Sequence, residues 1–129
     1  MHCQPVGIVT KTSPRSVADT VARITEITDA KGLKLFVVID HSGEAQASGL
    51  DLRDTKVVIF GSPAAGTPVM EAAPLAALDL PLKVLVFDSG GRTTLAYLAP
   101  DELAQRYGLS AEQSARLAGI DAITDAVIA

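Results

Sequence analysis

The sequence predicts a single compact α+β domain in which helices pack on a mixed, largely antiparallel sheet of about five strands. Two observations lead to this prediction. Dense apolar runs end at polar or glycine-rich turns, as expected for strands that are covered on both faces. Segments with apolar residues at helical spacing lie near both ends of the chain. The expected order of elements is β-α-β-β-β-β-α-α, and a length of 129 residues suits one domain with one core.

A short strand and a long helix are expected first. Residues 6–12 are rich in apolar side chains and suit a strand. Ser13 and Pro14 have the pattern of a helix cap followed by proline at the first helical position. Apolar residues then recur at helical spacing as far as Gly32, which suits the left-handed position after a helix end. We therefore expect a helix over residues 13–31.

Four more strands are expected in the middle of the chain. Three apolar runs lie at residues 35–39, 57–60 and 84–87. A turn signal at residues 88–91 precedes the β-branched and aromatic run at 92–98. The last two strands should therefore form a β-hairpin, which makes at least one pair of strands antiparallel.

The C-terminal part should be helical. Pro100 and the acidic residues after it suit a helix start, and Gly108 suits its end. Ser110 and Gln113 match a capping box, and an apolar stripe follows them. We expect a C-terminal helix over residues 110–129, with Gly119 as a point at which it can split.

Composition argues against several classes of function. A net charge of −4 and an isoelectric point near 5.0 leave no basic surface for nucleic acid. No apolar run approaches the ~20 residues of a membrane helix, and the N-terminus lacks the features of a signal peptide. We therefore expect a cytoplasmic protein that binds neither nucleic acid nor membrane. Cys3 is the only cysteine and the two histidines are isolated, so no metal site and no cofactor are expected.

The stretch FGSPAAGTPVM at residues 60–70 has the outline of a phosphate-binding loop. Two glycines with four residues between them precede Thr67, but the lysine of the nucleotide-binding pattern is missing. Pro63 and Pro68 also remove two backbone donors that a phosphate cradle would use. Two interpretations remain open. The stretch is a rigid turn in which Thr67 caps a short helix beginning at Pro68, or it binds a carboxylate or another small anion.

Two further residues at strand ends are candidates for chemistry. His41 follows a strongly apolar strand and begins an expected loop with one short helical turn at residues 41–50. A histidine there could act as an acid or a base near neutral pH. Lys83 opens another strand, where it could pair with Asp79 or extend into solvent. The serines lack a nucleophile elbow, so no hydrolase triad is expected.

Three stretches in a fixed order resemble the motifs of a known family. They are VVIDHSGEAQASGLDL, KVVIFGSPAAGTPVM and ALDLPLKVLVFD. Together they are similar to the domain of unknown function 302 family over about residues 6–109. The resemblance implies a compact α+β domain with helices packed on a curved sheet. It brings no established reaction or cofactor.

The family pattern can be carried over position by position. It departs from this sequence at Ser62, where asparagine is usual, and at Ala64, where lysine is usual. If the family lysine contacts an anion, that contact is lost here. The matching positions are His41, Gly61, Pro63, Gly66, Thr67, Asp79, Pro81 and Lys83.

Three functions remain open from the sequence. The first is non-catalytic binding of a small polar or anionic ligand at strand ends that meet at one edge of the sheet. Its candidate residues are His41, Gly61, Ser62, Gly66, Thr67 and Lys83. The second is an enzyme with His41 as general acid or base and Lys83 as electrostatic stabiliser. The third is a structural module without a ligand, in which apolar strands and the C-terminal stripe form the surface of a homodimer.

Overall fold

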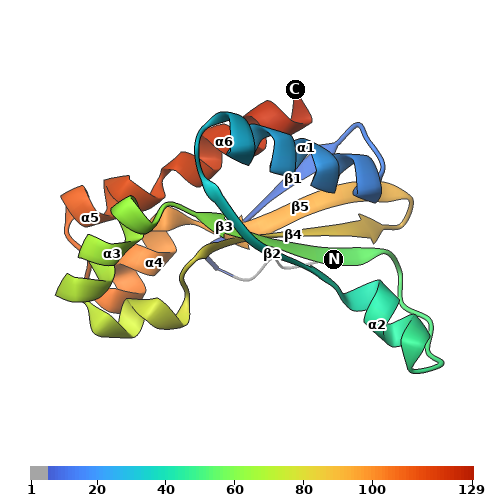
Figure 1. Ribbon diagram of the computed structural model, residues 1–129, viewed down its shortest axis with the longest axis horizontal. Coiled ribbons are helices and arrows are strands. Elements are labelled where there is room, and N and C mark those ends of the chain that lie inside the picture. The colour runs from blue at the N-terminus through green and yellow to red at the C-terminus, as the bar shows by residue number, and fades with distance from the viewer. Residues whose placement is uncertain (1–5) are drawn as a thin grey trace.

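A computed structural model of the protein describes residues 6–129 (Figure 1). The strands are β1 (Ile8–Ser13), β2 (Lys34–Asp40), β3 (Thr55–Gly61), β4 (Leu82–Ser89) and β5 (Arg92–Leu98). The helices are α1 (Val17–Ala30), α2 (His41–Ala47), α3 (Pro63–Ala72), α4 (Pro100–Tyr107), α5 (Ala111–Leu117) and α6 (Gly119–Ile128), with a 3-10 helix at Pro74–Leu78. Cys3 and His2 lie outside the described residues.

The five strands form one sheet in the order β1-β5-β4-β3-β2. All four neighbouring pairs are antiparallel, so the sheet is wholly antiparallel where a mixed, largely antiparallel one was expected. The predicted α+β class and the order of its elements are confirmed. β4 and β5 form the predicted hairpin, with Ser89 opposite Arg92. Gly90 and Gly91 in its turn have φ angles of 61° and 91°, which are accessible to glycine at little cost.

α1 and α6 cover one face of the sheet (Figure 1). Alternate residues of the three central strands point to these helices and are buried, as the two-residue period of a strand requires. Ile24 of α1 and Ile120 of α6 pack against them. The buried strand residues of this core are Val58, Phe60, Val84, Val86, Leu95 and Tyr97.

The remaining α-helices lie at opposite ends of the sheet. Figure 1 shows α3, α4 and α5 gathered at one end and α2 at the other. The α3–α5 group has a small core of its own, formed by Val69, Ala76, Leu103 and Leu117. Among residues 6–129, no helix is long and apolar enough to cross a membrane.

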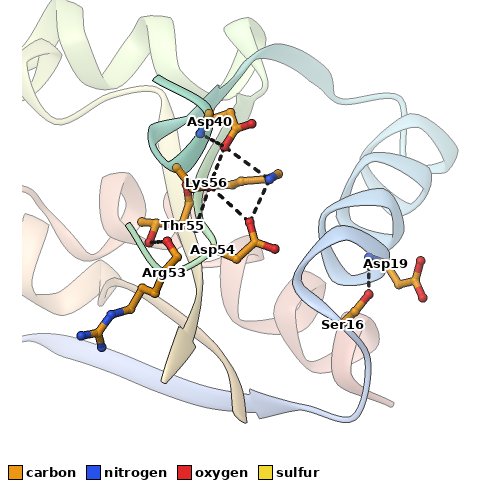
Figure 2. Close-up of polar contacts among 9 residues, drawn as sticks. Ser16, Asp19, Asp40, Arg53, Asp54, Thr55 and Lys56 are labelled. Carbon is orange, nitrogen blue, oxygen red and sulfur yellow. Dashed lines mark hydrogen bonds and ion pairs between the residues drawn. The ribbon is translucent and has the colours of Figure 1, made fainter. Parts of the chain in front are cut away.

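The start of α1 differs from the sequence-based prediction. Ser16 caps the helix by accepting a hydrogen bond from the Asp19 backbone N–H at 3.0 Å (Figure 2). Ser13, the predicted cap, is instead the last residue of β1, where it pairs with Thr93 of β5. Because the strand continues through Ser13, the helix begins after the next residue that can cap it. The capping box at Ser110 is confirmed, and the C-terminal helical region splits into α5 and α6.

Two basic residues near the N-terminal end of the fold hold α6 against the sheet. Lys11 of β1 donates to the Thr124 hydroxyl at 2.6 Å and pairs with Asp125 at 2.8 Å. Arg15 donates to the carbonyl of Val127 at 2.6 Å, where the last turn of a helix leaves carbonyls unpaired. The last helix is therefore tied to the first strand by polar contacts as well as by the core.

Candidate functional site

The candidate site is a cavity of about 370 Å³ beside residues 61–67. Phe36 of β2 and the start of α3 line it together with the segment that enters β4. Leu117 at the end of α5 and Ile123 of α6 also line it. Of the residues that line the cavity, Arg116 is the only charged one. The cavity is therefore an apolar space with a single guanidinium group in its wall.

The predicted glycine-proline stretch forms the start of α3. Ser62 caps this helix, and Pro63 occupies its first turn. The prediction that Thr67 caps a helix beginning at Pro68 is wrong, because both residues lie inside α3. Ser62 already supplies the cap, and a proline directly after it has a φ angle that suits the first helical position.

The backbone amides at the start of α3 are largely used within the helix itself. The Ser62 carbonyl accepts from the N–H groups of Ala65 at 3.0 Å and Gly66 at 2.8 Å. The Ser62 hydroxyl also accepts from Ala65, and Pro63 has no N–H to offer. The start of α3 is therefore a poor cradle for a phosphate. Arg116 is the stronger candidate for holding an anion.

Arg116 is placed by the helix that the capping box starts. Its side chain is 40% exposed and lies 3.6 Å from the carboxylate of Glu112, one turn earlier on α5. The Glu112 side chain is 84% exposed, so this ion pair is well solvated and weak. A ligand carboxylate could therefore replace Glu112 as the partner of Arg116.

His41 does not belong to this cavity. In the antiparallel β2–β3 pair, Asp40 lies opposite Lys56 and Lys34 lies opposite Gly61. At ~3.3 Å per residue, the two ends of β3 in this register are about 16 Å apart. Figure 1 accordingly shows α2, which His41 begins, and α3 at opposite ends of the sheet. The expectation of one site shared by His41 and residues 61–67 is therefore wrong.

The polar cluster beside His41 has a structural explanation. Asp40 caps α2 by accepting from the Gly43 N–H at 2.9 Å, so residues 41–47 form a helix of two turns where a looser loop was expected. Lys56 lies between Asp40 and Asp54, at 3.3 and 3.0 Å (Figure 2). Hydrogen bonds hold the pKa of Asp40 below its usual range. The bond from the Gly43 N–H has the largest effect, and those from Ser42 and Lys56 add to it. His41 itself is exposed.

Replacing Asp40 with alanine is expected to loosen α2, because the helix loses its cap and Lys56 loses one partner. Asparagine can still accept from Gly43, so Asp40→Asn should keep most of the cap. Hydrogen exchange of the α2 amides measures the effect, with faster exchange expected in Asp40→Ala than in Asp40→Asn. Equal exchange in both variants and the wild type would contradict the role of Asp40.

Lys83 does not line the candidate cavity either. It is exposed, and its ammonium group donates to the Pro81 carbonyl at 3.2 Å. Together with Asp79 it lines a second cavity of about 410 Å³. Asp79 bonds with Arg106 at 2.9 Å and with the Tyr107 hydroxyl. His41 lines neither cavity, so these two cavities do not bring His41 and Lys83 together for catalysis.

The candidate cavity thus collects part of the predicted set and several unpredicted residues. Gly61, Ser62, Gly66 and Thr67 all line it. Phe36, Met70 and Arg116 line it too and were not predicted as site residues. Within residues 6–129, no three His, Cys, Asp or Glu side chains are arranged to hold a metal ion.

Comparison with known proteins identifies related sequences. A family model described as "Domain of unknown function DUF302" matches residues 9–127. "Fluoride-specific ion channel FluC 1" of Brucella suis biovar 1 (strain 1330) is 38% identical over 104 residues, which are 80% of this chain and 41% of that protein. The protein of the same name from Brucella abortus biovar 1 (strain 9-941) is also 38% identical over 104 residues, 80% of this chain and 38% of that protein. The chain spans about two fifths of these relatives.

A solved structure has the same fold. It is the crystal structure of an uncharacterized conserved protein DUF302 from Bacillus stearothermophilus. The two structures agree with a TM-score of 0.80 over 96% of this chain and 97% of the other, at 18% sequence identity. At that identity the agreement concerns the fold alone.

Proposed function

The chain belongs to the domain of unknown function DUF302 family, and for this domain we propose a non-catalytic role, the binding of a small molecule. The proposed ligand has an apolar body and one anionic group, and it occupies the cavity beside residues 61–67. A single observation supports this ligand best, namely an apolar cavity of about 370 Å³ with one charged side chain, Arg116. Ligand pockets of proteins are of this size and are mostly apolar with a few polar groups.

The chemistry of Arg116 favours a carboxylate as the anionic group. A guanidinium group is planar and always charged, and it can donate two parallel hydrogen bonds to a carboxylate. The apolar walls exclude water from one side of this contact, which strengthens the attraction. The anionic ligand expected from the sequence is retained, but its anchor becomes Arg116 instead of His41 or Lys83.

Replacing Arg116 with alanine is expected to weaken binding of an apolar carboxylate by about tenfold or more, because a hydrogen-bonded charge pair is lost. The probe is anilinonaphthalene sulfonate, whose fluorescence reports binding and which decanoate should displace. Decanol, which has the same apolar body without the charge, should bind Arg116→Ala and the wild type equally. Arg92→Ala, at the exposed first residue of β5, is the matched control and should leave both affinities unchanged.

Two results would contradict the proposal. If neither decanoate nor decanol binds the wild type, the cavity does not take an apolar ligand of this class. If decanoate binds Arg116→Ala as tightly as the wild type, Arg116 is not the anchor of the anionic group.

The longer relatives support a second function, as an accessory domain of a membrane ion channel. In the Brucella proteins named as fluoride channels, the matched segment is about two fifths of the chain. No helix of residues 6–129 could cross a membrane, so we place any channel function of those proteins in their remaining part. Co-expression of this chain with a fluoride channel that lacks such a segment tests the idea. Failure to co-purify in detergent would count against it.

A homodimer and a cytoplasmic location remain predictions. Leu35 and Val37, near the start of the edge strand β2, are 41% and 45% exposed, and this apolar surface supports the homodimer. Light scattering at micromolar concentration measures the oligomeric state, and a monomer there would contradict the homodimer.

A further inference from the structure

The wall of the cavity formed by Phe36 is built differently from the others. In the β2–β3 register, Leu35 pairs with Phe60 and Val37 pairs with Ile59, so Phe36 is an extra residue in β2. A β-bulge leaves the extra residue unpaired in the ladder and bends the strand locally. The Phe36 side chain lines the candidate cavity. An aromatic ring on an unpaired residue of β2 therefore forms part of the cavity wall.

The Phe36 side chain can move at a lower free-energy cost than the buried side chains that also line the cavity. Leu117 and Ile123 also line the cavity but are only 3% and 4% exposed, so they are fixed by packing. Phe36 is 43% exposed and lies on an edge strand, outside which residues 6–129 place no further strand. The ammonium group of Lys34 lies 5.0 Å from the centre of its ring. A cation at this distance favours one ring position without enclosing the ring.

We propose that Phe36 is the specificity-determining residue of the cavity and sets the largest apolar body that a ligand can have. The inference rests on the proposed function, because it concerns a ligand with an apolar body and a carboxylate. Phe36 limits the space next to it, while Arg116 holds the charged end. Removing the ring should open the cavity to longer ligands. Each additional methylene that is buried there should improve affinity about fourfold.

The experiment compares straight-chain carboxylates from hexanoate to hexadecanoate as competitors of anilinonaphthalene sulfonate. Phe36→Ala should move the best-bound acid to a longer chain and raise affinity for that longer acid about tenfold relative to the wild type. Phe36→Trp should move the optimum to a shorter chain. Leu35→Ala and Val37→Ala are matched controls, because both residues are exposed on the same strand and neither lines the cavity. They should keep the wild-type optimum.

The possible results separate this inference from the proposed function. If no acid binds the wild type, the proposed function fails, and the inference fails with it. If acids bind but Phe36→Ala and Phe36→Trp keep the wild-type optimum, the inference is overturned while the proposed function stands. Opposite shifts in the two variants, with unchanged controls, would support the inference. Since Phe36→Trp retains a ring at the bulge, it tests the idea even if the alanine variant does not fold.

Discussion

Replacing Phe60 with alanine is expected to lower the free energy of unfolding by about 3–5 kcal/mol. The ring is fully buried in the core beneath α1 and α6. Without the ring, the protein loses the favourable free energy of moving the ring from water into the core. The substitution also leaves a cavity that the surrounding strands can only partly fill. Urea unfolding followed by circular dichroism measures the change.

Phe36→Ala is the matched control for this prediction, because it makes the same chemical change at a ring that is 43% exposed. Its expected cost is below about 1 kcal/mol. Equal destabilisation by the two substitutions would show that burial of Phe60 in this core does not dominate its contribution. It would also show that Phe36 is more than a wall of the cavity.

Asp79→Asn is expected to lower the free energy of unfolding by about 1–3 kcal/mol near neutral pH. Asp79 connects the segment before β4 to α4, where it accepts from the Tyr107 hydroxyl and from Arg106 at 2.9 Å. Its side chain is 23% exposed, so these hydrogen bonds are only partly screened by water. Asparagine keeps the shape but removes the charge. Asp51→Asn, at an exposed loop residue, is the control and should change stability little.

The effect of Asp79→Asn should depend on pH in a defined direction. The pKa of Asp79 lies below its usual value of 3.8. The hydrogen bond from Tyr107 lowers it most, and the hydrogen bond and charge of Arg106 lower it further. A carboxylate with a lowered folded pKa stabilises the protein fully above its unfolded pKa, and this contribution is lost as the pH falls through the folded pKa. The difference between wild type and variant should therefore be large at about pH 7 and shrink as the pH falls below the usual aspartate pKa of 3.8. A difference that stays constant with pH would contradict the charge-based explanation.

The fold was largely predictable, because its signals are local. The apolar runs mark the central strands, and the pair Gly90 and Gly91 marks the hairpin. The start of α1 was misplaced because Ser13 and Ser16 are both acceptable caps. Only the pairing of β1 with β5, which is distant in sequence, decides that Ser13 stays in the strand.

The expectation of a shared site failed for a topological reason. His41 follows the end of β2, and Ser62 follows the end of β3. Neighbouring antiparallel strands run in opposite directions, so the C-terminal ends of two such strands lie at opposite ends of the sheet. Nothing in the motifs themselves says that β2 and β3 are neighbours. Grouping the motifs by strand end alone therefore placed His41 on the wrong side.

Part of the cavity was predictable, and the rest depends on tertiary structure. The stretch that begins at Gly61 was identified by its glycines and prolines. Ser62, where the family usually has asparagine, keeps a physical role, since both residues are good helix caps. Arg116 reaches the cavity from a helix far along the chain, and Phe36 lines it from an irregular position in β2. Neither placement has a signal in the local sequence.

The ties between β1 and α6 also constrain how the chain can fold. Ile8 at the start of β1 pairs with Leu98 of β5, and Lys11 and Arg15 have polar partners in α6. Pairing between distant segments is slow, because a long loop must close before any contact forms. The β4–β5 hairpin can form early, whereas the polar ties of Lys11 and Arg15 cannot form before α6 is present. During synthesis of the chain, these ties therefore form only after α6 has left the ribosomal exit tunnel.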